Sequence, residues 1–147
     1  MSEVWERSRQ DGFVISTDMS RLDVPWILDF LKNESYWANT VDRVVIEKSI
    51  RNSIAFGLYA STGKQAGCAL VISDRARYAY LSDIFIGTSY RGQGLGVWLL
   101  TTLMTYPEFE NVNRWALRTR EAHTLYEKVG FRRIGDTLGR VMELTRP

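Results

Sequence analysis

Three glycines between an apolar strand and an amphipathic helix constrain the fold of this chain more than any other feature. They lie in the run Arg91-Gly92-Gln93-Gly94-Leu95-Gly96, after an apolar stretch from Tyr78 to Ile86 that predicts a long central strand. The first amides of a helix lack internal partners and the helix dipole adds positive potential, while glycines let an anion approach the backbone. The buried face of the helix is predicted from Leu95, Trp98, Leu99, Leu103 and Met104. The turn therefore predicts a diphosphate site at residues 92–97.

Two familiar phosphate-binding patterns do not fit the spacing of this turn. A nucleotide P-loop needs a glycine, four residues and then Gly-Lys-Ser/Thr, but the turn contains no lysine. A dinucleotide fingerprint needs G-x-G-x-x-G, and its third glycine would fall on Val97 or Leu99, according to whether it begins at Gly92 or Gly94. Neither kind of site is indicated, and a strand-to-helix turn that binds no ligand stays open as the alternative.

The other periodicities predict one mixed α/β domain over residues 1–147, because no Pro/Gly/Ser-rich linker divides the chain. Two of the predicted strands flank the turn signal Ser61-Thr62-Gly63-Lys64 and should form a hairpin. The element order implies an antiparallel front half followed by a crossover. The predicted strands are 13–16, 53–59, 65–73, 78–86, 114–119 and 141–144, and the predicted helices are 22–31, 41–50, the segment after the glycines and 122–129.

Composition narrows the classes of protein and of site. The net charge of +2 gives no reason to expect nucleic acid or an anionic membrane as a partner. The single cysteine, Cys68, cannot form an internal disulfide, and with His123 as the single histidine a Cys/His zinc site is out of reach. The charged first residues do not resemble a signal peptide, and no segment approaches the ~18 apolar residues of a membrane span. We expect a cytoplasmic protein without a metal.

Two motifs at matching separation carry a family resemblance. The spacing Arg91-x-x-Gly94-x-Gly96 resembles the pyrophosphate-binding motif of the GNAT acetyltransferase superfamily, and the run from Leu125 to Phe131, Leu-Tyr-Glu-Lys-Val-Gly-Phe, closely resembles a second motif of that family. The resemblance covers roughly residues 53–135. It implies a GNAT-like α/β (α+β) fold, with a mixed, mostly antiparallel central sheet flanked by about four helices.

The same resemblance implies acetyl-CoA as co-substrate. It assigns the pyrophosphate to Arg91, Gly92, Gln93, Gly94, Leu95, Gly96 and Val97, and the pantetheine arm to the strand at Ile84, Phe85 and Ile86. Backbone amides of that strand are expected to stabilise the oxyanion, as in relatives. One position departs from the pattern: many members carry a cofactor-contacting asparagine where this chain has Thr119, so that contact is not carried over.

Resemblance assigns Tyr126 the role of general acid beside the CoA sulfur. The residues agree with this assignment, because Tyr126 shares an apolar helix face with Ala122, Leu125 and Val129, and Gly130 is well placed to end that helix. A departing thiolate benefits from a proton, which a buried phenol could supply. The alternative is a core tyrosine bonded to the backbone.

The general base is the least determined part of the predicted site. Asp83 lies on the strand beside the expected acetyl site, so its carboxylate is the first candidate, with a structural hydrogen-bond acceptor as the alternative. Glu47 and Glu121 are weaker candidates, the role of His123 is open, and the proton could also pass to water without a dedicated base. Cys68 lies in an apolar strand and is expected to be inert, which favours direct transfer in a ternary complex over an acetyl-cysteine route.

The resemblance therefore implies an N-acetyltransferase that acts on a primary amine, with a small molecule as the favoured acceptor. An aromatic group on the first two helices and their loop, Trp26, Tyr36 and Trp37, is a candidate acceptor wall or a cover for the sheet. The arginines at 118, 120, 132 and 133 could meet CoA phosphates, meet an acidic acceptor or simply be solvated. A protein lysine or N-terminal acetylase, a non-catalytic acetyl-CoA-binding module and a homodimer remain open.

Overall fold

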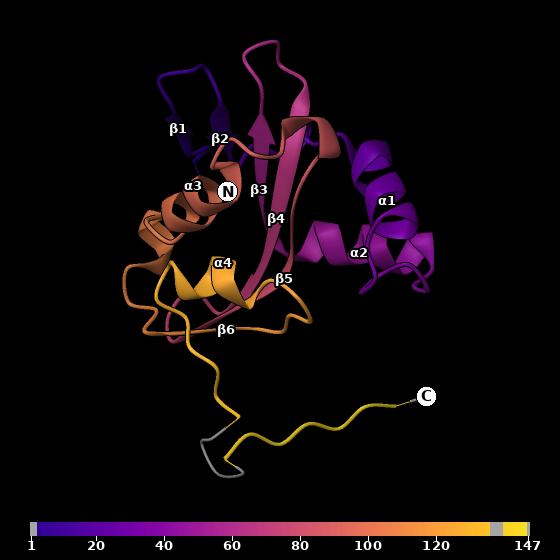
Figure 1. The fold of residues 1–147 in the computed structure, drawn as a ribbon, viewed down its shortest axis with the longest axis vertical. Helices are drawn as coiled ribbons and strands as arrows, with labels where there is room; N and C mark the ends of the chain where they lie inside the picture. Colours follow the sequence, from indigo (N-terminus) through magenta and orange to yellow (C-terminus); the bar gives the residue numbers. More distant parts are fainter. Residues whose placement is uncertain (1–2, 136–139, 147) are drawn as a thin grey trace.

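A six-stranded sheet runs in chain order from β1 to β6 and carries every other element (Figure 1). The computed structural model describes residues 3–135 and 140–146. All neighbouring strands are antiparallel except β5 and β6, which are parallel, so the mixed, mostly antiparallel sheet is confirmed. The strands are β1 (Glu6–Ser8), β2 (Val14–Ser16), β3 (Ile54–Tyr59), β4 (Gln65–Ser73), β5 (Tyr78–Ile86) and β6 (Arg114–Leu117).

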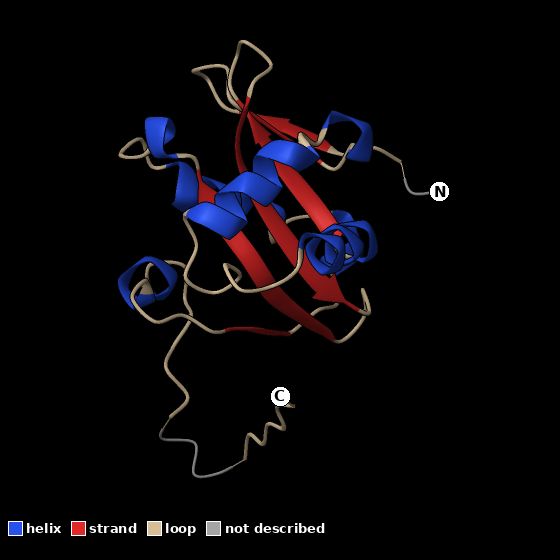
Figure 2. Cartoon of the chain, turned by 90° about the vertical axis from the view of Figure 1, so that its right-hand side faces the viewer, coloured by secondary structure: helices blue, strands red, loops and turns tan. Residues whose placement is uncertain are grey.

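The helices form a layer on each face of the sheet (Figure 2). Helices α1 (Val24–Asn33) and α2 (Arg43–Asn52) share one buried apolar cluster with Cys68, Leu70 and Phe85 of the sheet. Helices α3 (Leu95–Leu103) and α4 (His123–Glu127) share a second cluster on the other face. Short 3-10 turns occupy Met19–Arg21, Thr88–Tyr90 and Pro107–Phe109. None of the helices described is both long and apolar enough to cross a membrane.

Local signals set several of these boundaries, although the helices predicted at 22–31 and 41–50 lie two residues before α1 and α2, and β6 ends two residues before the predicted 119. The Asp23 side chain accepts from the Trp26 backbone N–H at 3.1 Å, which caps the start of α1. Gly63 turns the β3–β4 hairpin at φ +88°, in the left-handed region that favours glycine. The β5 strand covers the predicted span from Tyr78 to Ile86.

Strand β1 is an element that the sequence analysis missed. Its three residues are all exposed and polar, so no alternation of apolar side chains marks the segment. It forms because a neighbour is present: Glu6, Arg7 and Ser8 pair with β2 in an antiparallel register. Charged side chains suit such an edge strand, since they discourage pairing with another chain.

The strand predicted at Val141–Leu144 is wrong. This segment has no regular secondary structure, and the side chains of Val141, Met142 and Leu144 are 64%, 92% and 77% exposed. Figure 1 shows it, in yellow, running apart from the sheet beyond β6. A strand requires hydrogen bonds from a neighbour, and apolar residues alone do not supply one. An ion pair connects this segment to the rest of the protein, with Arg118 Nη1 2.7 Å from Glu143 Oε2.

We predict that Leu99→Ala lowers the free energy of unfolding by about 2–5 kcal/mol, because it leaves a cavity where a fully buried leucine of α3 packs against the sheet. The matched control is Leu144→Ala, which removes the same atoms from a side chain that is 77% exposed and should change little. Urea denaturation measures both. Equal losses in the two variants would contradict the placement of the core.

Candidate functional site

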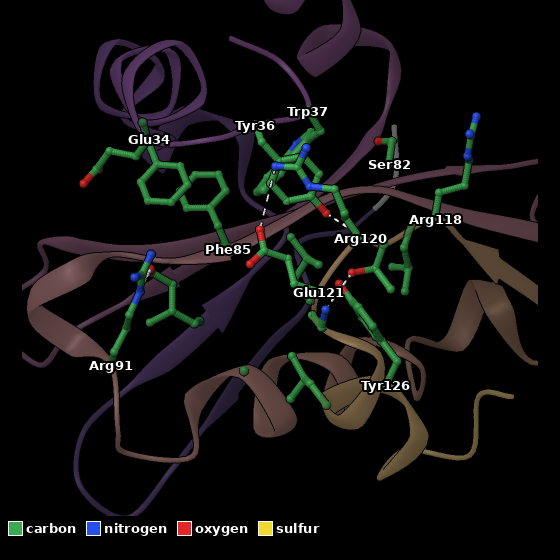
Figure 3. A pocket seen from close by; sticks show the side chains of 18 of the residues that line it. Glu34, Tyr36, Trp37, Ser82, Phe85, Arg91, Arg118, Arg120, Glu121 and Tyr126 are labelled. Atoms are coloured by element: carbon green, nitrogen blue, oxygen red, sulfur yellow. Dashed lines mark hydrogen bonds and ion pairs between the residues drawn. The ribbon is translucent and has the colours of Figure 1, made fainter. Parts of the chain in front are cut away.

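A cavity of about 1070 Å³ opens where β5 and β6 separate (Figure 3). The two strands pair only from Tyr78 with Arg114 to Leu81 with Leu117. Beyond Leu81, β5 continues to Ile86 while β6 has ended, so the backbone of Ser82–Ile86 has no strand neighbour on this side. The cavity therefore lies where β6 would run if it continued alongside β5. Among its lining residues are Ile84, Phe85, Ile86, Arg91, Gly96 and Tyr126.

A bulge in β5 decides which side chains face which layer. Leu81 pairs with Val71 and Asp83 pairs with Leu70, so Ser82 is an extra residue in the ladder. As a result Leu81 and Ile84 both pack into the α3–α4 cluster, although they are three positions apart. Phe85 packs into the α1–α2 cluster, and Asp83, two residues before it, lies on that same side.

The glycine turn has the geometry of an anion site. Gly92 and Gly94 adopt φ +80° and +75°, in the left-handed region, and a Cβ at Gly92 would meet no atom within 4 Å. The first α3 bond runs from the Trp98 N–H to the Gly94 carbonyl at 3.1 Å, which leaves the amides of residues 95–97 without helical partners. Leu95 is buried and anchors the helix, whereas Gly96 borders the cavity. The turn thus presents backbone donors and open space.

Arg9 supports this turn from the β1–β2 connection, and the sequence analysis missed it. Its Nη1 donates to the Gln93 carbonyl at 3.1 Å, and its Nη2 pairs with Asp11 at 2.7 Å. Within the turn, Gln93 Nε2 donates to the Tyr90 carbonyl and Arg91 Nε donates to the Ile86 carbonyl, both at 3.2 Å. Arg9 and Gln93 are 84 residues apart, so no local signal could have linked them.

Tyr126 is held at the floor of the cavity by α4 and the glycine that follows it. The ring is 8% exposed and meets Phe131 edge-on at 5.9 Å, and Gly130 adopts φ +104° as the C-terminal glycine predicted for this helix. Among the described residues its hydroxyl has no hydrogen-bond partner, so the alternative of a backbone-bonded core tyrosine does not hold. Figure 3 shows the ring pointing from α4 into the cavity. Burial, with a smaller contribution from Tyr36, raises the pKa of Tyr126 to about 12.

Asp83 lies under Trp37 and is not among the residues that line the cavity. The Trp37 indole Nε1 donates to Asp83 Oδ1 at 2.6 Å. Burial raises the pKa of the Asp83 carboxyl, while hydrogen bonds from Trp37 and Ser82 act in the opposite direction. The chemical role of this carboxylate stays a prediction, and its cover by Trp37 was not foreseen.

Of the other residues that the sequence analysis considered, some line the cavity and others lie elsewhere. Glu121 borders the cavity, whereas Glu47 lies on α2 and does not. His123 lines a second hollow of about 360 Å³ with Arg132 and Arg133. Cys68 is fully buried, and burial raises the pKa of its thiol far above the ordinary value, as suits an inert core residue.

The predicted aromatic wall is divided between two roles. Tyr36 and Trp37 line the cavity, whereas Trp26 packs beside the stacked pair of Phe30 and Phe85 and does not line it. Arg118 and Arg120 line the cavity too: Arg120 lies against the Tyr36 ring, and Arg118 pairs with Glu143. The Thr119 Oγ1, at the position that departs from the family motif, accepts from the Ala122 N–H at 3.0 Å just before α4. Across residues 3–135 and 140–146, no group of three or more His, Cys, Asp or Glu is placed to hold a metal ion.

Comparisons with known proteins agree with this geometry. Residues 42–133 match the family model described as an acetyltransferase (GNAT) domain. A crystal structure from Xanthomonas campestris, assigned to the GNAT family of acetyltransferases, is 32% identical and covers 100% of this chain and 96% of its own, with a TM-score of 0.81. A curated protein of Gibberella zeae, assigned as an acetyltransferase, is 27% identical over 87% of this chain and 82% of its own length.

A further structure is similar in fold and contains a ligand. It is a GNAT family acetyltransferase from Elizabethkingia anophelis with acetyl-CoA bound, 18% identical, covering 84% of this chain and 78% of its own, with a TM-score of 0.64.

We predict that Asp83→Asn raises the melting temperature at pH 7, and that this gain shrinks toward pH 4. The folded pKa of Asp83 lies above its ordinary value of 3.8, so wild-type stability falls, relative to the variant, as pH rises from there through the folded pKa. The asparagine oxygen can still accept from Trp37.

Asp74→Asn is the control of opposite sign, measured by thermal unfolding at pH 4, 5.5 and 7. Backbone N–H groups of Arg77, Ala76 and Tyr78 lower the pKa of Asp74, so its stabilising contribution is present above the ordinary pKa and is lost as pH falls. This variant should therefore lose stability at pH 7 and approach wild type in acid. The same pH trend in both variants would contradict the assigned environments.

Proposed function

The chain belongs to the GNAT family of acetyltransferases, and we propose that it transfers the acetyl group of acetyl-CoA to a primary amine of a small molecule, directly within a ternary complex. One observation carries this proposal: the gap between β5 and β6 joins the glycine turn at one end to the unbonded hydroxyl of Tyr126 at the other. An anion anchor, an open strand edge and a buried proton donor in a single cavity are what acetyl transfer from a long thioester requires.

The glycine turn is proposed to bind the pyrophosphate of acetyl-CoA. The amides of residues 95–97 and the open space at Gly92 would receive the phosphates, with Arg91 at the border of the cavity as a cation. Gln93 and Leu95 support this site indirectly. The Gln93 side chain makes a hydrogen bond within the turn, and the Leu95 side chain packs into the core. The acetyl-CoA bound in the Elizabethkingia anophelis protein supports the choice of ligand.

The free side of β5 is proposed to receive the thioester. Residues Ile84, Phe85 and Ile86 lie past the end of β6, so backbone groups on this side, apart from the Ile86 carbonyl that accepts from Arg91, are available to hydrogen-bond the pantetheine arm and an oxyanion. In the transfer, the neutral amine nitrogen forms a bond to the carbonyl carbon, the carbon–sulfur bond breaks, the nitrogen loses a proton and the thiolate gains one.

Tyr126 is proposed to supply the proton to the departing thiolate. A pKa of about 12 keeps the phenol protonated at every working pH, so it can act as a donor and not as a resident base. Its hydroxyl is not committed to another group among the residues described, and it faces the cavity. A non-catalytic binding module would have no need of such a donor.

Asp83 is proposed as the group that receives the acceptor's proton, with Glu121 at the cavity border and bulk water as the alternatives. A free alkylamine has a pKa of about 10.4, so it arrives as an ammonium and must lose a proton before it attacks. A buried carboxylate with a raised pKa is a better proton acceptor than an exposed one. Release of thiol from acetyl-CoA against a panel of amines tests the activity and identifies the acceptor class.

A small acceptor is favoured by a contact that crosses the cavity on the side away from the glycine turn. The Tyr36 hydroxyl accepts from the Arg120 backbone N–H at 2.8 Å, which joins the loop after α1 to the segment after β6. A large peptide would have to break this contact, whereas a small amine need not.

We predict that Gly92→Ala weakens acetyl-CoA binding at least tenfold, because the new methyl group occupies the space proposed for a phosphate. The control is Gly63→Ala in the β3–β4 turn, where φ is +88° and a Cβ would likewise meet no atom within 4 Å. Both variants should lose about 1–2 kcal/mol of stability through left-handed strain. Calorimetry should show weaker binding only for Gly92→Ala, and equal affinities would remove the turn from the cofactor site.

We predict that Tyr126→Phe lowers kcat about 100-fold or more and leaves acetyl-CoA affinity nearly unchanged, because only the proton donor is lost. Tyr78→Phe is the control, since it removes a phenol from the start of β5 at a side chain that is 43% exposed. Steady-state rates and calorimetry on both variants provide the measurement. A Tyr126→Phe enzyme with full turnover would eliminate the acid role.

A further inference from the structure

The loop after α1 holds two aromatic side chains over the acceptor side of the cavity. Ser35 is buried and fastens the loop: its Oγ donates to the Leu31 carbonyl at 2.7 Å and accepts from the Ala38 N–H at 3.1 Å. Between Ser35 and buried Ala38, the side chains of Tyr36 and Trp37 project and remain 38% and 39% exposed. The backbone of the loop is therefore anchored, while the two rings can change rotamer without unfolding it.

Each ring contacts a different wall. Tyr36 binds the segment after β6, where Arg120 donates its backbone N–H and places its guanidinium 4.0 Å from the ring centroid. Trp37 binds β5, where its indole N–H donates to Asp83. The rings meet edge-on at 5.2 Å. Figure 3 shows Tyr36 and Trp37 across the cavity from Tyr126.

The Trp37 side chain covers the Asp83 carboxylate, which has no cation beside it among the described residues. Among the residues described, no ion pair includes Asp83, its hydrogen-bond donor is the neutral indole of Trp37, and the neighbouring Ser82 hydroxyl donates to the Leu70 carbonyl. Facing it are Cys68 on β4, whose thiol stays protonated, and Tyr80 on its own strand, whose phenol pKa is raised mainly by burial. A buried carboxylate without a cation is costly when ionised, and it attracts a positive group that can reach it.

We propose that Trp37 is a gate over Asp83, and that the ammonium of the acceptor displaces its indole N–H and binds the carboxylate in its place. This rests on the proposed function and identifies how the acceptor binds. The indole N–H is a neutral donor, whereas the ammonium carries a positive charge that also attracts the carboxylate by Coulomb's law, so the exchange favours the substrate. The bound ammonium then transfers its proton to Asp83 or to water, which yields the neutral amine that attacks the thioester.

The gate selects acceptors by charge. A neutral alcohol of the same shape offers no advantage over the indole N–H and leaves Trp37 in place. A cationic acceptor forms an ion pair with the Asp83 carboxylate. The displaced Trp37 ring, with Tyr36 beside it, can then line the path of the acceptor's alkyl chain. The proposal thus restricts the acceptor to amines that arrive protonated.

The first test observes Trp37 directly and does not depend on turnover. The chain has five tryptophans, so an NMR spectrum of the ¹⁵N-labelled protein should contain five indole N–H signals, and Trp37→Phe identifies the relevant one. We expect propylammonium to move this signal in a saturable manner in wild type and not in Asp83→Asn, while propanol moves it in neither. A signal that propylammonium leaves unmoved, or moves equally in Asp83→Asn, would overturn the gate.

The second test measures catalysis with the amine found by thiol release. Trp37→Phe should lower the KM for that amine several-fold at high pH without lowering kcat, because no indole N–H competes for Asp83. It should also move the acid limb of kcat/KM to higher pH, since loss of a donor raises the pKa of the carboxyl further.

Trp26→Phe is the matched control, because Trp26 packs on Phe85 and makes no hydrogen bond to Asp83. It should change neither KM nor the pH profile, and Trp37→Phe should have no effect when Asp83→Asn is also present. Equal effects in the two tryptophan variants, or an effect that persists without Asp83, would reject the gate. Absence of turnover with every amine would instead reject the proposed function, and the NMR result would still decide the gate.

Discussion

The structure depends on the separation of two parallel strands. β5 and β6 are paired for four residues, after which β6 ends and β5 continues alone. A sheet that stayed paired would have no cavity here, since backbone and side chains would fill the space. Because β5 is long and its first half is paired on both sides, the strand remains rigid where it loses one neighbour. The unpaired stretch therefore offers backbone groups to a ligand without the mobility of a loop.

The bulge at Ser82 gives this open stretch two chemical faces. It places Ile84 in the apolar layer of α3 and α4, beside the glycine turn and Tyr126, and leaves Asp83 and Phe85 in the layer of α1 and α2. A regular ladder would put Leu81 and Ile84 on opposite faces, because side chains alternate. One extra residue thus separates an apolar side, where the thioester is proposed to bind, from the side of Asp83, where the amine is proposed to bind.

The sequence predicts what local patterns encode. The strand from Tyr78 to Ile86, the glycine turn and the helix that ends at Gly130 each carry their own signals, and the family motifs add their order. Contacts between distant segments leave no such signal: Arg9 reaches Gln93 over 84 residues, and Trp37 reaches Asp83 over 46. The strand expected at Val141–Leu144 failed for the related reason that apolar residues specify a face, whereas pairing also needs a neighbour.

Burial has different consequences for the two groups that are proposed to donate and accept protons. It raises the pKa of both Tyr126 and Asp83, since it disfavours the charged form of each. For a proton donor this is an advantage, because the phenol stays protonated at any pH the protein meets. For a proton acceptor, a raised pKa is an advantage only while the carboxyl stays ionised in the resting protein, because a neutral carboxyl cannot take a proton. The indole N–H of Trp37 counteracts burial at Asp83, because its hydrogen bond lowers the pKa that burial raises, and in the proposed gate a cation takes over this part.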